Sequence, residues 1–500
     1  MEGKNNLIYS PLSTFLPGGS VKEKSDHNDD PDFSSTISTT KRNKVCIRCD
    51  PKIRIGLMFP IIFAFIYLLH LLYLEYLTND VEGNRSDGDE IKIEITIVDI
   101  LPERPYEGYV LDMGRINEHC EPTDYKKSAL KRFPVQSCLD YLDTRQYDYM
   151  VNPPINSTTS AATDNVTTTN TSSSILTSNL QCAPGREPML FHVYWRGKFT
   201  DKIALNIKSF LYTQPLRCSK MLVWLEKNDE DLRANKHAKS LLRFSPTNIE
   251  FRKWDITEQL NYDSIYSGWE RKLKSKTKVV SYSDTVRFVL LHRYGGIYVD
   301  ADTIFLRDMS PLYYLDYEFS YRWSFKFDYN TAVLRIRPNS TTSRKIINGA
   351  MKNSMKFHPF AIKKYLFADE KDQTKEVLDK QLYMMPVALF DPLWLKSDLH
   401  VKSQKLKPNL ARWNDVFSAG LLNNEFPGAN KELLAKAAND TTLLRKNDEF
   451  FRGAFTYHWH NLWKQRIANG SWFDVLQKGY DDFIEGKIRN PYNESITDYT

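Results

Sequence analysis

The strongest constraint on the fold of this chain is a run of 20 residues without a formal charge, from Ile55 to Leu74, bounded by Arg54 and Glu75. As a helix it would be about 30 Å long, which matches the hydrocarbon thickness of a bilayer. A cleaved signal peptide would begin near the first residue, whereas this run follows about fifty mostly polar residues. The sequence therefore predicts one transmembrane helix, over 54–76, and a buried helix of a soluble domain is the alternative interpretation.

Charged residues are distributed unevenly about this run. Basic residues precede it, namely Lys41, Arg42, Lys44, Arg48, Lys52 and Arg54, and acidic residues follow it, namely Asp80, Glu82, Asp87, Asp89 and Glu90. Because basic flanks stay in the cytosol, the N-terminus is predicted to be cytosolic and the bulk of the chain lumenal or extracellular. All Asn-x-Ser/Thr glycosylation sequons also follow the run, which agrees with this orientation. They begin at Asn84, Asn156, Asn165, Asn170, Asn339, Asn439, Asn469 and Asn493.

Four cysteines follow the run, in the part predicted to face an oxidising compartment. Four cysteines allow three pairings. We take pairing between neighbours, Cys120 with Cys138 and Cys182 with Cys218, as the working hypothesis.

Composition divides the chain into six segments. They are a cytosolic tail (1–53), the transmembrane signal-anchor (54–76), a lumenal stem with a small ordered subregion (77–151), a glycosylated linker rich in Ser, Thr and Asn (152–185), a folded domain (186–485) and a C-terminal tail (486–500). In the stem, residues 91–100 alternate between apolar and polar side chains and are predicted to form a strand. The linker holds too little apolar side chain to offset the chain entropy that folding would cost.

The folded domain opens with alternating strand and helix patterns. Residues 189–195, 220–226 and 249–255 are apolar runs of strand length, separated by helical patterns over 200–212 and 229–243. Strand–helix–strand repetition predicts an α/β sandwich with a largely parallel sheet. Such sheets bind ligands at the carboxyl ends of their strands.

The stretch most informative about function is SYSDTVRFVLLHRYGGIYVDADTIFLRD, residues 281–308. It predicts a helix capped by Ser281 or Ser283 and ended by Gly295-Gly296, because glycine readily adopts the left-handed conformation at the end of a helix. A short strand over 297–299 follows, and two aspartates come directly after it.

Those aspartates are Asp300 and Asp302. Alternation places residues i and i+2 on one face of a strand, so the two carboxylates are predicted to meet at its end. Oxygen ligands favour Mg²⁺ or Mn²⁺, which keep coordination positions free for phosphate oxygens. Asp284 and Arg287 are three residues apart on the helix and are predicted to form one polar patch. The alternative interpretations are a solvated turn for the aspartates, an ordinary helix N-terminal charge for Asp284 and a surface position for Arg287.

Part of this stretch also resembles the motif of a different class of enzyme. Ile297 to Thr303 resembles the strand-then-DxDxT start of haloacid-dehalogenase-like phosphatases, in which the first aspartate is a nucleophile and the second an acid/base. That motif usually opens its domain, whereas about a hundred residues of strand and helix pattern precede it here. We keep the phosphatase as a minor alternative.

The segment SDTVRFVLLHRYGGIYVDADTIFL resembles the signature of the DXD-containing glycosyltransferases grouped with lactosylceramide α-1,4-galactosyltransferases and fungal initiating α-1,6-mannosyltransferases. Looser similarity includes NTAVLR (330–335), FHPFAIKKY (357–365), FDPLW (390–394) and YHWHNLW (457–463). The resemblance implies a GT-A fold, dependence on Mn²⁺ or Mg²⁺, a nucleotide-sugar donor and retention of the anomeric configuration. By the same resemblance, Asp300 and Asp302 match the aspartates that bind the metal and the diphosphate, and Asp284 and Arg287 match the donor-contacting pair.

Three further positions follow from the resemblance. His458 or His460 matches a late histidine that closes the site over the metal or the diphosphate, and Trp463 is the aromatic residue that follows it. Trp195 matches an aromatic residue that stacks on the nucleobase. A core histidine and a core tryptophan are the alternative interpretations.

These expectations describe a Golgi type II membrane protein whose lumenal GT-A domain is a Rossmann-like mixed sheet flanked by helices. It would transfer a hexose, galactose or mannose, from a UDP- or GDP-sugar to a hydroxyl group of a glycan or glycolipid. A non-catalytic membrane glycoprotein that uses the fold as a binding module is the alternative. The net charge of +6 is small for 500 residues, so no nucleic-acid partner is expected.

Overall fold

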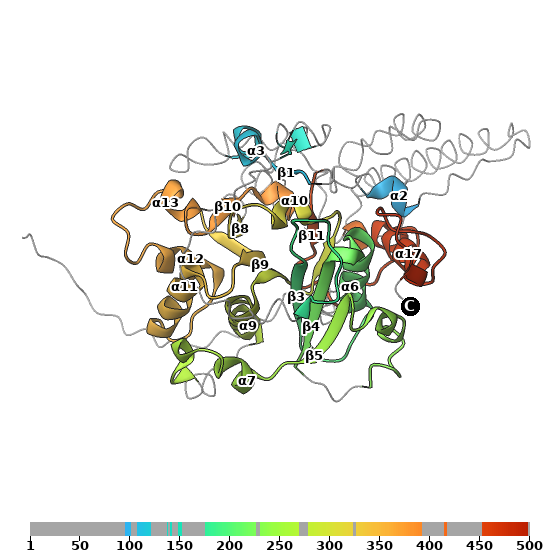
Figure 1. Ribbon diagram of the computed structural model, residues 1–500, viewed down its shortest axis with the longest axis horizontal. Coiled ribbons are helices and arrows are strands. Elements are labelled where there is room, and N and C mark those ends of the chain that lie inside the picture. Colours follow the sequence, from blue (N-terminus) through green and yellow to red (C-terminus); the bar gives the residue numbers. More distant parts are fainter. Residues whose placement is uncertain are drawn as a thin grey trace, which may run out of the picture. The chain divides into compact units, whose positions relative to one another are not determined.

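The structure is a computed structural model of the whole chain (Figure 1). It describes residues 96–101, 108–121, 138, 141–142, 149–152, 176–226, 231–269, 279–323, 327–392, 415–417 and 453–498. The chain divides into two compact units, Met1–Ile91 and Lys92–Thr500, and every described residue belongs to the second. The predicted transmembrane helix over 54–76 lies outside the described residues. Within the described ranges, no helix has the length and apolar character needed to cross a bilayer.

A mixed seven-stranded sheet forms the centre of the second unit, in the order β10-β8-β9-β6-β3-β4-β5. The strands are β3 (Met189–Trp195), β4 (Ser219–Leu225), β5 (Ile249–Lys253), β6 (Gly296–Val299), β8 (Phe319–Arg322), β9 (Tyr329–Ile336) and β10 (Tyr383–Met385). The four strands from β6 to β5 are parallel, whereas β9 runs antiparallel to both β6 and β8. The predicted mixed α/β class and its first three strands are therefore confirmed.

Helices cover both faces of the sheet because side chains alternate along each strand. On β3, Phe191 and Val193 enter one buried cluster, whereas Leu190 and Tyr194 enter the other. The first cluster includes residues of α6 (Asp201–Thr213) and α17 (Trp472–Ile484), and the second includes residues of α9 (Val279–Tyr294), α11 (Thr341–Lys352) and α12 (Pro359–Leu366). In Figure 1 these two groups of helices lie on opposite sides of the strands. The helix predicted over 200–212 is α6.

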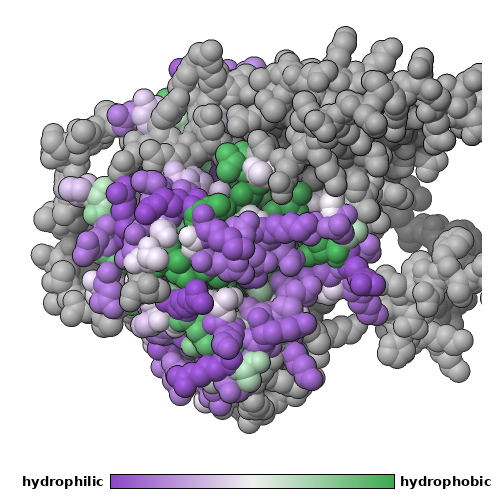
Figure 2. All heavy atoms as spheres, turned by 90° about the vertical axis from the view of Figure 1, so that its right-hand side faces the viewer, coloured by the Kyte–Doolittle hydropathy of each residue, from purple (hydrophilic) through white to green (hydrophobic). Residues whose placement is uncertain are grey.

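The outer layer is built from amphipathic helices such as α17. Its buried residues Trp472, Leu476, Tyr480 and Phe483 recur at helical spacing, and Ser471 caps its first turn. Figure 2 views the side on which α17 lies, and the described residues there are mainly hydrophilic, with hydrophobic ones gathered in a band between them. The helices therefore turn most of their apolar surface toward the sheet.

Shorter elements complete the unit. They are α2 (Ile97–Ile100), β1 (Val110–Leu111), α3 (Met113–Cys120), β2 (Met150–Val151), η3 (Leu216–Cys218), η4 (Lys239–Phe244), α7 (Ile256–Leu260), η5 (Ser264–Tyr266), β7 (Thr303–Phe305), α10 (Ser310–Tyr313), α13 (Lys375–Asp379), η6 (Val387–Leu389), η7 (Asp415–Phe417), β11 (Thr456–His458) and η8 (Ile496–Asp498), where η marks a 3₁₀ helix. The disulfides Cys120–Cys138 and Cys182–Cys218 are present, so the neighbour pairing is confirmed.

Both chain segments that flank the predicted domain pack onto it. Buried residues of the predicted stem, among them Ile116 and Tyr149, belong to the first core cluster. In the segment predicted as a C-terminal tail, the Glu494 carboxylate accepts hydrogen bonds from the backbone N–H groups of Leu216 and Arg217, at 2.8 and 3.1 Å. The end of the chain thereby stabilises the turn before β4.

Local predictions were wrong at three places. Residues 97–100 form the helix α2 where a strand was predicted, because Ile97 packs on Gly479 of α17, where an added Cβ would lie only 2.4 Å from the Ile97 Cβ. In 229–243, where a helix was predicted, the described residues form turns and η4. The Asn235 side chain accepts hydrogen bonds from the N–H groups of His237 and Ala238, and these bonds take the place of the backbone bonds of a helix. The helix α9 begins at Val279, so neither Ser281 nor Ser283 is its cap.

A buried histidine in β3 predicts a dependence of stability on pH. His192 Nε2 lies 2.9 Å from the Gly295 carbonyl oxygen, and its Nδ1 accepts a hydrogen bond from Trp224 Nε1 at 3.2 Å. Burial, opposed by the Gly295 contact and aided by Arg252, lowers the pKa of His192 from 6.5 to about 4. As the pH falls through 6.5, the unfolded chain therefore binds a proton at this histidine, whereas the folded chain binds it only near pH 4.

The free energy of unfolding is expected to fall across this window by about 3 kcal/mol on account of His192 alone. Urea unfolding at a series of pH values measures it. His192→Gln has no titrating group at this position, so its unfolding free energy should fall less between pH 6.5 and 4. Equal pH slopes for the two proteins would contradict the prediction.

Candidate active site

The aspartate pair follows the end of β6, the fourth strand of the parallel set. The backbone N–H of Asp300 donates to the Ala332 carbonyl at 2.8 Å, and the Asn206 side chain of α6 donates to the Thr303 carbonyl at 2.6 Å. These bonds hold both ends of the Asp300–Thr303 turn. The two aspartates thus stand at the carboxyl edge of the sheet, where α/β sheets bind ligands.

The Gly295-Gly296 pair lets the chain turn directly from α9 into β6, the strand that leads to the aspartates. Both glycines have positive φ, +67° and +92°, as the predicted end of the helix requires. A Cβ added at Gly296 would lie 2.3 Å from the Leu190 carbonyl oxygen on β3, so the strand could not keep its place in the sheet.

We therefore expect Gly296→Ala to lower the free energy of unfolding by at least about 2 kcal/mol, since backbone clash adds to backbone strain. Urea unfolding provides the measurement. Gly197→Ala is the matched control, because Gly197 also has positive φ, +119°, but an added Cβ there meets nothing within 4 Å. The control should lose only the cost of strain, and an equal loss in both variants would contradict the steric argument.

A second strand pair brings a histidine to the aspartates. β7, which follows the Asp300–Thr303 turn, pairs antiparallel with β11, and Thr303 lies opposite His458. The Trp459 N–H donates to the Asp302 carbonyl at 2.9 Å, which extends the ladder to the site. His458 Nε2 consequently lies 3.1 Å from Asp302 Oδ1.

The backbone after β11 turns sharply. His460 and Asn461 both have positive φ, +50° and +62°, a conformation that costs a non-glycine residue about 1–2 kcal/mol. The Asn461 N–H donates to Asp302 Oδ2 at 2.6 Å, and His460 Nε2 lies 2.6 Å from Asp391 Oδ2. These contacts hold the strained turn in place.

Asp300, Asp302 and His458 form a candidate metal centre. Their ligand atoms lie within 4.8 Å of one another. Two carboxylates and an imidazole suit Mn²⁺ or Mg²⁺, so the residues present fit a divalent cation. Of the two predicted histidines, His458 is the one that joins the aspartates, whereas His460 joins Asp391 and His458 in a second group of possible ligands.

Asp284 and Arg287 lie behind Asp300. Arg287 Nη2 is 3.1 Å from Asp284 Oδ1 and 2.9 Å from Asp300 Oδ1, and its Nη1 donates to Thr331 Oγ1 at 2.7 Å. Only 4% of the Arg287 side chain is exposed. The predicted polar patch on α9 is therefore formed, and Arg287 is neither on the surface nor open toward solvent.

Charges within the site depend on one another. Burial raises the pKa of Asp302, but the charge and hydrogen bond of His458 outweigh burial and lower it to about 2. Burial lowers the pKa of His458, but Asp302, Asp391 and Asp300 raise it to about 9. Burial also raises the pKa of Asp300 to about 6, against the opposing effect of Arg287. His458 and Asp302 therefore each favour the charged form of the other.

The two predicted tryptophans come together. The ring centroids of Trp195, at the end of β3, and Trp463 lie 4.8 Å apart. Trp195 Nε1 donates to the Lys198 carbonyl at 2.9 Å, and Trp463 Nε1 donates to Asn461 Oδ1 at 3.2 Å. Lys202, a buried residue of α6, donates to the backbone carbonyls of Leu462, Trp463 and Gln465. The pair forms an aromatic surface at the carboxyl end of β3.

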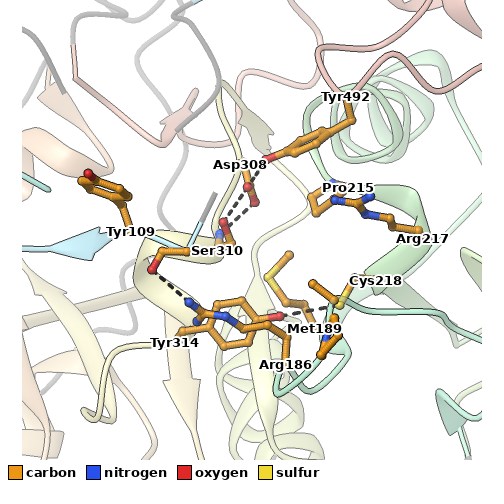
Figure 3. A pocket seen from close by; sticks show the side chains of 13 residues that line it. Tyr109, Arg186, Met189, Pro215, Arg217, Cys218, Asp308, Ser310, Tyr314 and Tyr492 are labelled. Atoms are coloured by element: carbon orange, nitrogen blue, oxygen red, sulfur yellow. Dashed lines mark hydrogen bonds between the residues drawn. The ribbon is translucent and has the colours of Figure 1, made fainter. Parts of the chain in front are cut away.

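Two cavities lie at the opposite edge of the sheet. One, of about 220 Å³, is lined by Met189 and Cys218 beside the amino ends of β3 and β4 (Figure 3). In it the Asp308 carboxylate lies between Ser310 and Tyr492 and accepts hydrogen bonds from both. The other, of about 720 Å³, is lined by Leu190 and Gly296, at the amino ends of β3 and β6. Neither cavity contains a predicted site residue.

Sequence reasoning missed Asp391. This residue follows η6 and is fully buried beside His458 and His460. FDPLW stood out in the sequence only as a looser similarity, and a lone aspartate before proline is usually part of a turn. Its proximity to the two histidines becomes visible only in the structure.

Residues 201–318 match the model of a protein family described as "Glycosyltransferase sugar-binding region containing DXD motif". This part includes Asp284, Arg287, Asp300 and Asp302. No curated protein matches the chain.

Several solved structures are similar at low identity. The PaToxG glycosyltransferase is 17% identical with a TM-score of 0.29, over 54% of this chain and 90% of that chain. The apo form of the glycosyltransferase GlyE of Streptococcus pneumoniae TIGR4 is 13% identical with a TM-score of 0.30, over 54% of this chain and 65% of that chain. The galactosyltransferase LgtC in complex with donor and acceptor sugar analogs is 12% identical with a TM-score of 0.29, over 58% and 95%. These TM-scores are low, whereas the family match shows that residues 201–318 carry a glycosyltransferase-like sugar-binding region with a DXD motif.

Proposed function

We propose that the chain is a metal-dependent glycosyltransferase that moves a hexose from a nucleotide sugar to a hydroxyl group of a glycan or glycolipid. The observation that carries the proposal is the convergence of Asp300, Asp302 and His458 at the carboxyl edge of the sheet. A bound Mn²⁺ or Mg²⁺ held by these groups would stabilise the charge on the departing diphosphate as a Lewis acid.

The remaining site residues orient this centre and the donor. Arg287 fixes Asp300 by an ion pair, and the Asn461 N–H fixes the second oxygen of Asp302. The aromatic surface of Trp195 and Trp463 supports the nucleobase by stacking. The fixed geometry reduces the reorganisation needed when the donor binds.

We infer galactose or mannose as the hexose, a UDP- or GDP-sugar as donor, and retention of configuration. The basic flank before 54–76, the sequons after it and the two disulfides support a type II Golgi membrane protein with a lumenal catalytic domain. Protease protection of the C-terminal part in intact microsomes tests this orientation.

A panel of donors tests the activity. The purified full-length chain is incubated with UDP-galactose, UDP-glucose, UDP-N-acetylglucosamine and GDP-mannose, each with Mn²⁺, Mg²⁺ or EDTA, and released nucleoside diphosphate is measured. We expect hydrolysis of at least one donor with metal and none with EDTA. If no donor is hydrolysed and no nucleoside diphosphate binds with Mn²⁺, the binding module becomes the better explanation. Metal-dependent release of phosphate from p-nitrophenyl phosphate would favour the phosphatase.

A further inference from the structure

Asp391 lies directly beside the candidate metal centre. Its side chain is completely buried, and its Oδ2 atom lies 2.6 Å from His460 Nε2 and 3.8 Å from His458 Nδ1. The two imidazole rings are 4.0 Å apart between centroids. Both histidines at the end of β11 therefore converge on one buried carboxylate.

His458 stands between two carboxylates. Its Nε2 faces Asp302 at 3.1 Å, and its Nδ1 faces Asp391. The His458 Nδ1 atom has no hydrogen-bond partner among the described residues, although only 7% of the residue is exposed. A buried ring nitrogen of this kind normally has a partner.

The protonation of the imidazole determines which kind of partner the Nδ1 atom of His458 needs. A neutral imidazole that uses Nε2 as a metal ligand carries its proton on Nδ1, where it is a donor. Ligating histidines usually donate this second N–H to a carboxylate or carbonyl group, which fixes the ring and raises its basicity. The Asp391 carboxylate lies on the Nδ1 side of His458, 3.8 Å away, and is an acceptor of this kind.

We propose that Asp391 is a positioning residue: it accepts the Nδ1–H of His458 and thereby holds Nε2 toward the divalent cation of the DXD centre. The proposal rests on the metal-dependent function proposed above. A closure of about 1 Å brings the two atoms to hydrogen-bond distance. His460 also contacts the Asp391 carboxylate, and the left-handed turn at His460 and Asn461 places the His460 ring beside it.

A second cation bound by Asp391, His458 and His460 is the competing arrangement, because their ligand atoms also lie within 4.8 Å. Two ligands of one octahedral ion at 2.1 Å are about 3 Å apart. The 2.6 Å between His460 Nε2 and Asp391 Oδ2 is the length of a hydrogen bond instead. The geometry therefore favours positioning over a second metal.

Mn²⁺ binding without any nucleotide sugar tests the proposal. Free Mn²⁺ is measured by electron paramagnetic resonance during titration of the purified full-length chain. Asp391→Asn is expected to weaken Mn²⁺ binding by about 10–100-fold. Binding of one equivalent should be retained. Asp263→Asn is the matched control, because Asp263 also contacts a buried histidine, His292 at 3.1 Å, away from the centre, and should bind Mn²⁺ as the wild type does.

A second comparison shows whether Asp391 acts through His458. In a His458→Gln background, Asp391→Asn should weaken Mn²⁺ binding no further, because the group that it positions is gone. An additive loss would overturn the proposal. So would wild-type affinity in Asp391→Asn, or two Mn²⁺ equivalents per chain.

A spectroscopic readout remains if Asp391→Asn does not fold. Electron spin echo modulation of Mn²⁺ bound to the wild type should show coupling to an imidazole nitrogen, and its absence would overturn the proposal. Asp302→Asn separates this result from the proposed function. If Asp302→Asn binds Mn²⁺ as the wild type does, the metal-dependent function fails. If only Asp302→Asn loses binding while Asp391→Asn retains it, the positioning role alone fails.

Discussion

Asp302→Asn is expected to lower the rate of metal-dependent sugar transfer by about 10³-fold, equal to about 4 kcal/mol of transition-state stabilisation. The asparagine has nearly the same volume but no charge, so it removes a carboxylate of the proposed metal centre and leaves the His458 imidazole without its ion-pair partner. The Asn461 N–H keeps an oxygen acceptor at this position, so the turn after β11 should persist. Initial rates of nucleoside diphosphate release at saturating Mn²⁺ measure the effect.

Asp308→Asn is the matched control for this change. Asp308 is also buried and lies six residues along the chain, but at the other edge of the sheet, where Ser310 and Tyr492 donate to it. Burial raises the pKa of Asp308 to about 6, so an uncharged acceptor is tolerated there. This variant should keep the wild-type rate. An Asp302→Asn protein that is folded and fully active would exclude the proposed mechanism.

The part of the site that is local in sequence could be predicted. One stretch contains α9, the Gly295-Gly296 turn, β6 and both aspartates, and each follows from a short-range rule: helical spacing, the left-handed conformation of glycine and alternation along a strand. The i and i+3 spacing also predicted the contact between Asp284 and Arg287.

The choice between His458 and His460 could not be made from sequence. Alternation along a strand places both on one face, so the pattern treats them alike. In the structure β11 ends at His458, and positive φ at His460 redirects the chain. His458 therefore meets Asp302, whereas His460 meets Asp391. A left-handed conformation at a residue other than glycine is set by tertiary contacts, which no local pattern reports.

Local sequence rules also could not predict where the Arg287 side chain lies. Helical spacing puts it on the same face as Asp284 but does not say which way that face points. The structure buries it against Asp300, which follows β6, and against Thr331 of β9, the antiparallel neighbour of β6. Arg287 thereby becomes the counter-ion of a carboxylate in the candidate metal centre.

Arg287→Met is the second change with a large expected effect, and its effect is on stability. Methionine fills much of the volume but leaves the buried carboxylate of Asp284 and the partly buried carboxylate of Asp300 without their shared cation. Removing one partner of a buried ion pair costs about 3–5 kcal/mol. Urea unfolding at pH 7.5 should therefore show a loss of this size. Arg293→Met on the same helix is the control, since its partner Glu258 is 62% exposed and such pairs contribute about 1 kcal/mol or less.

The loss in Arg287→Met should also depend on pH in a defined direction. Burial already raises the pKa of Asp300 to about 6, and removal of the guanidinium takes away the main group that opposes this rise. Above its pKa, Asp300 would carry a charge that Arg287 no longer balances, and below it the neutral acid is tolerated. The difference in unfolding free energy between wild type and Arg287→Met should therefore shrink as the pH falls from 7.5 to 5. A difference that is constant over this range would show that the lost packing of Arg287 on Tyr298, and not its charge, accounts for the destabilisation.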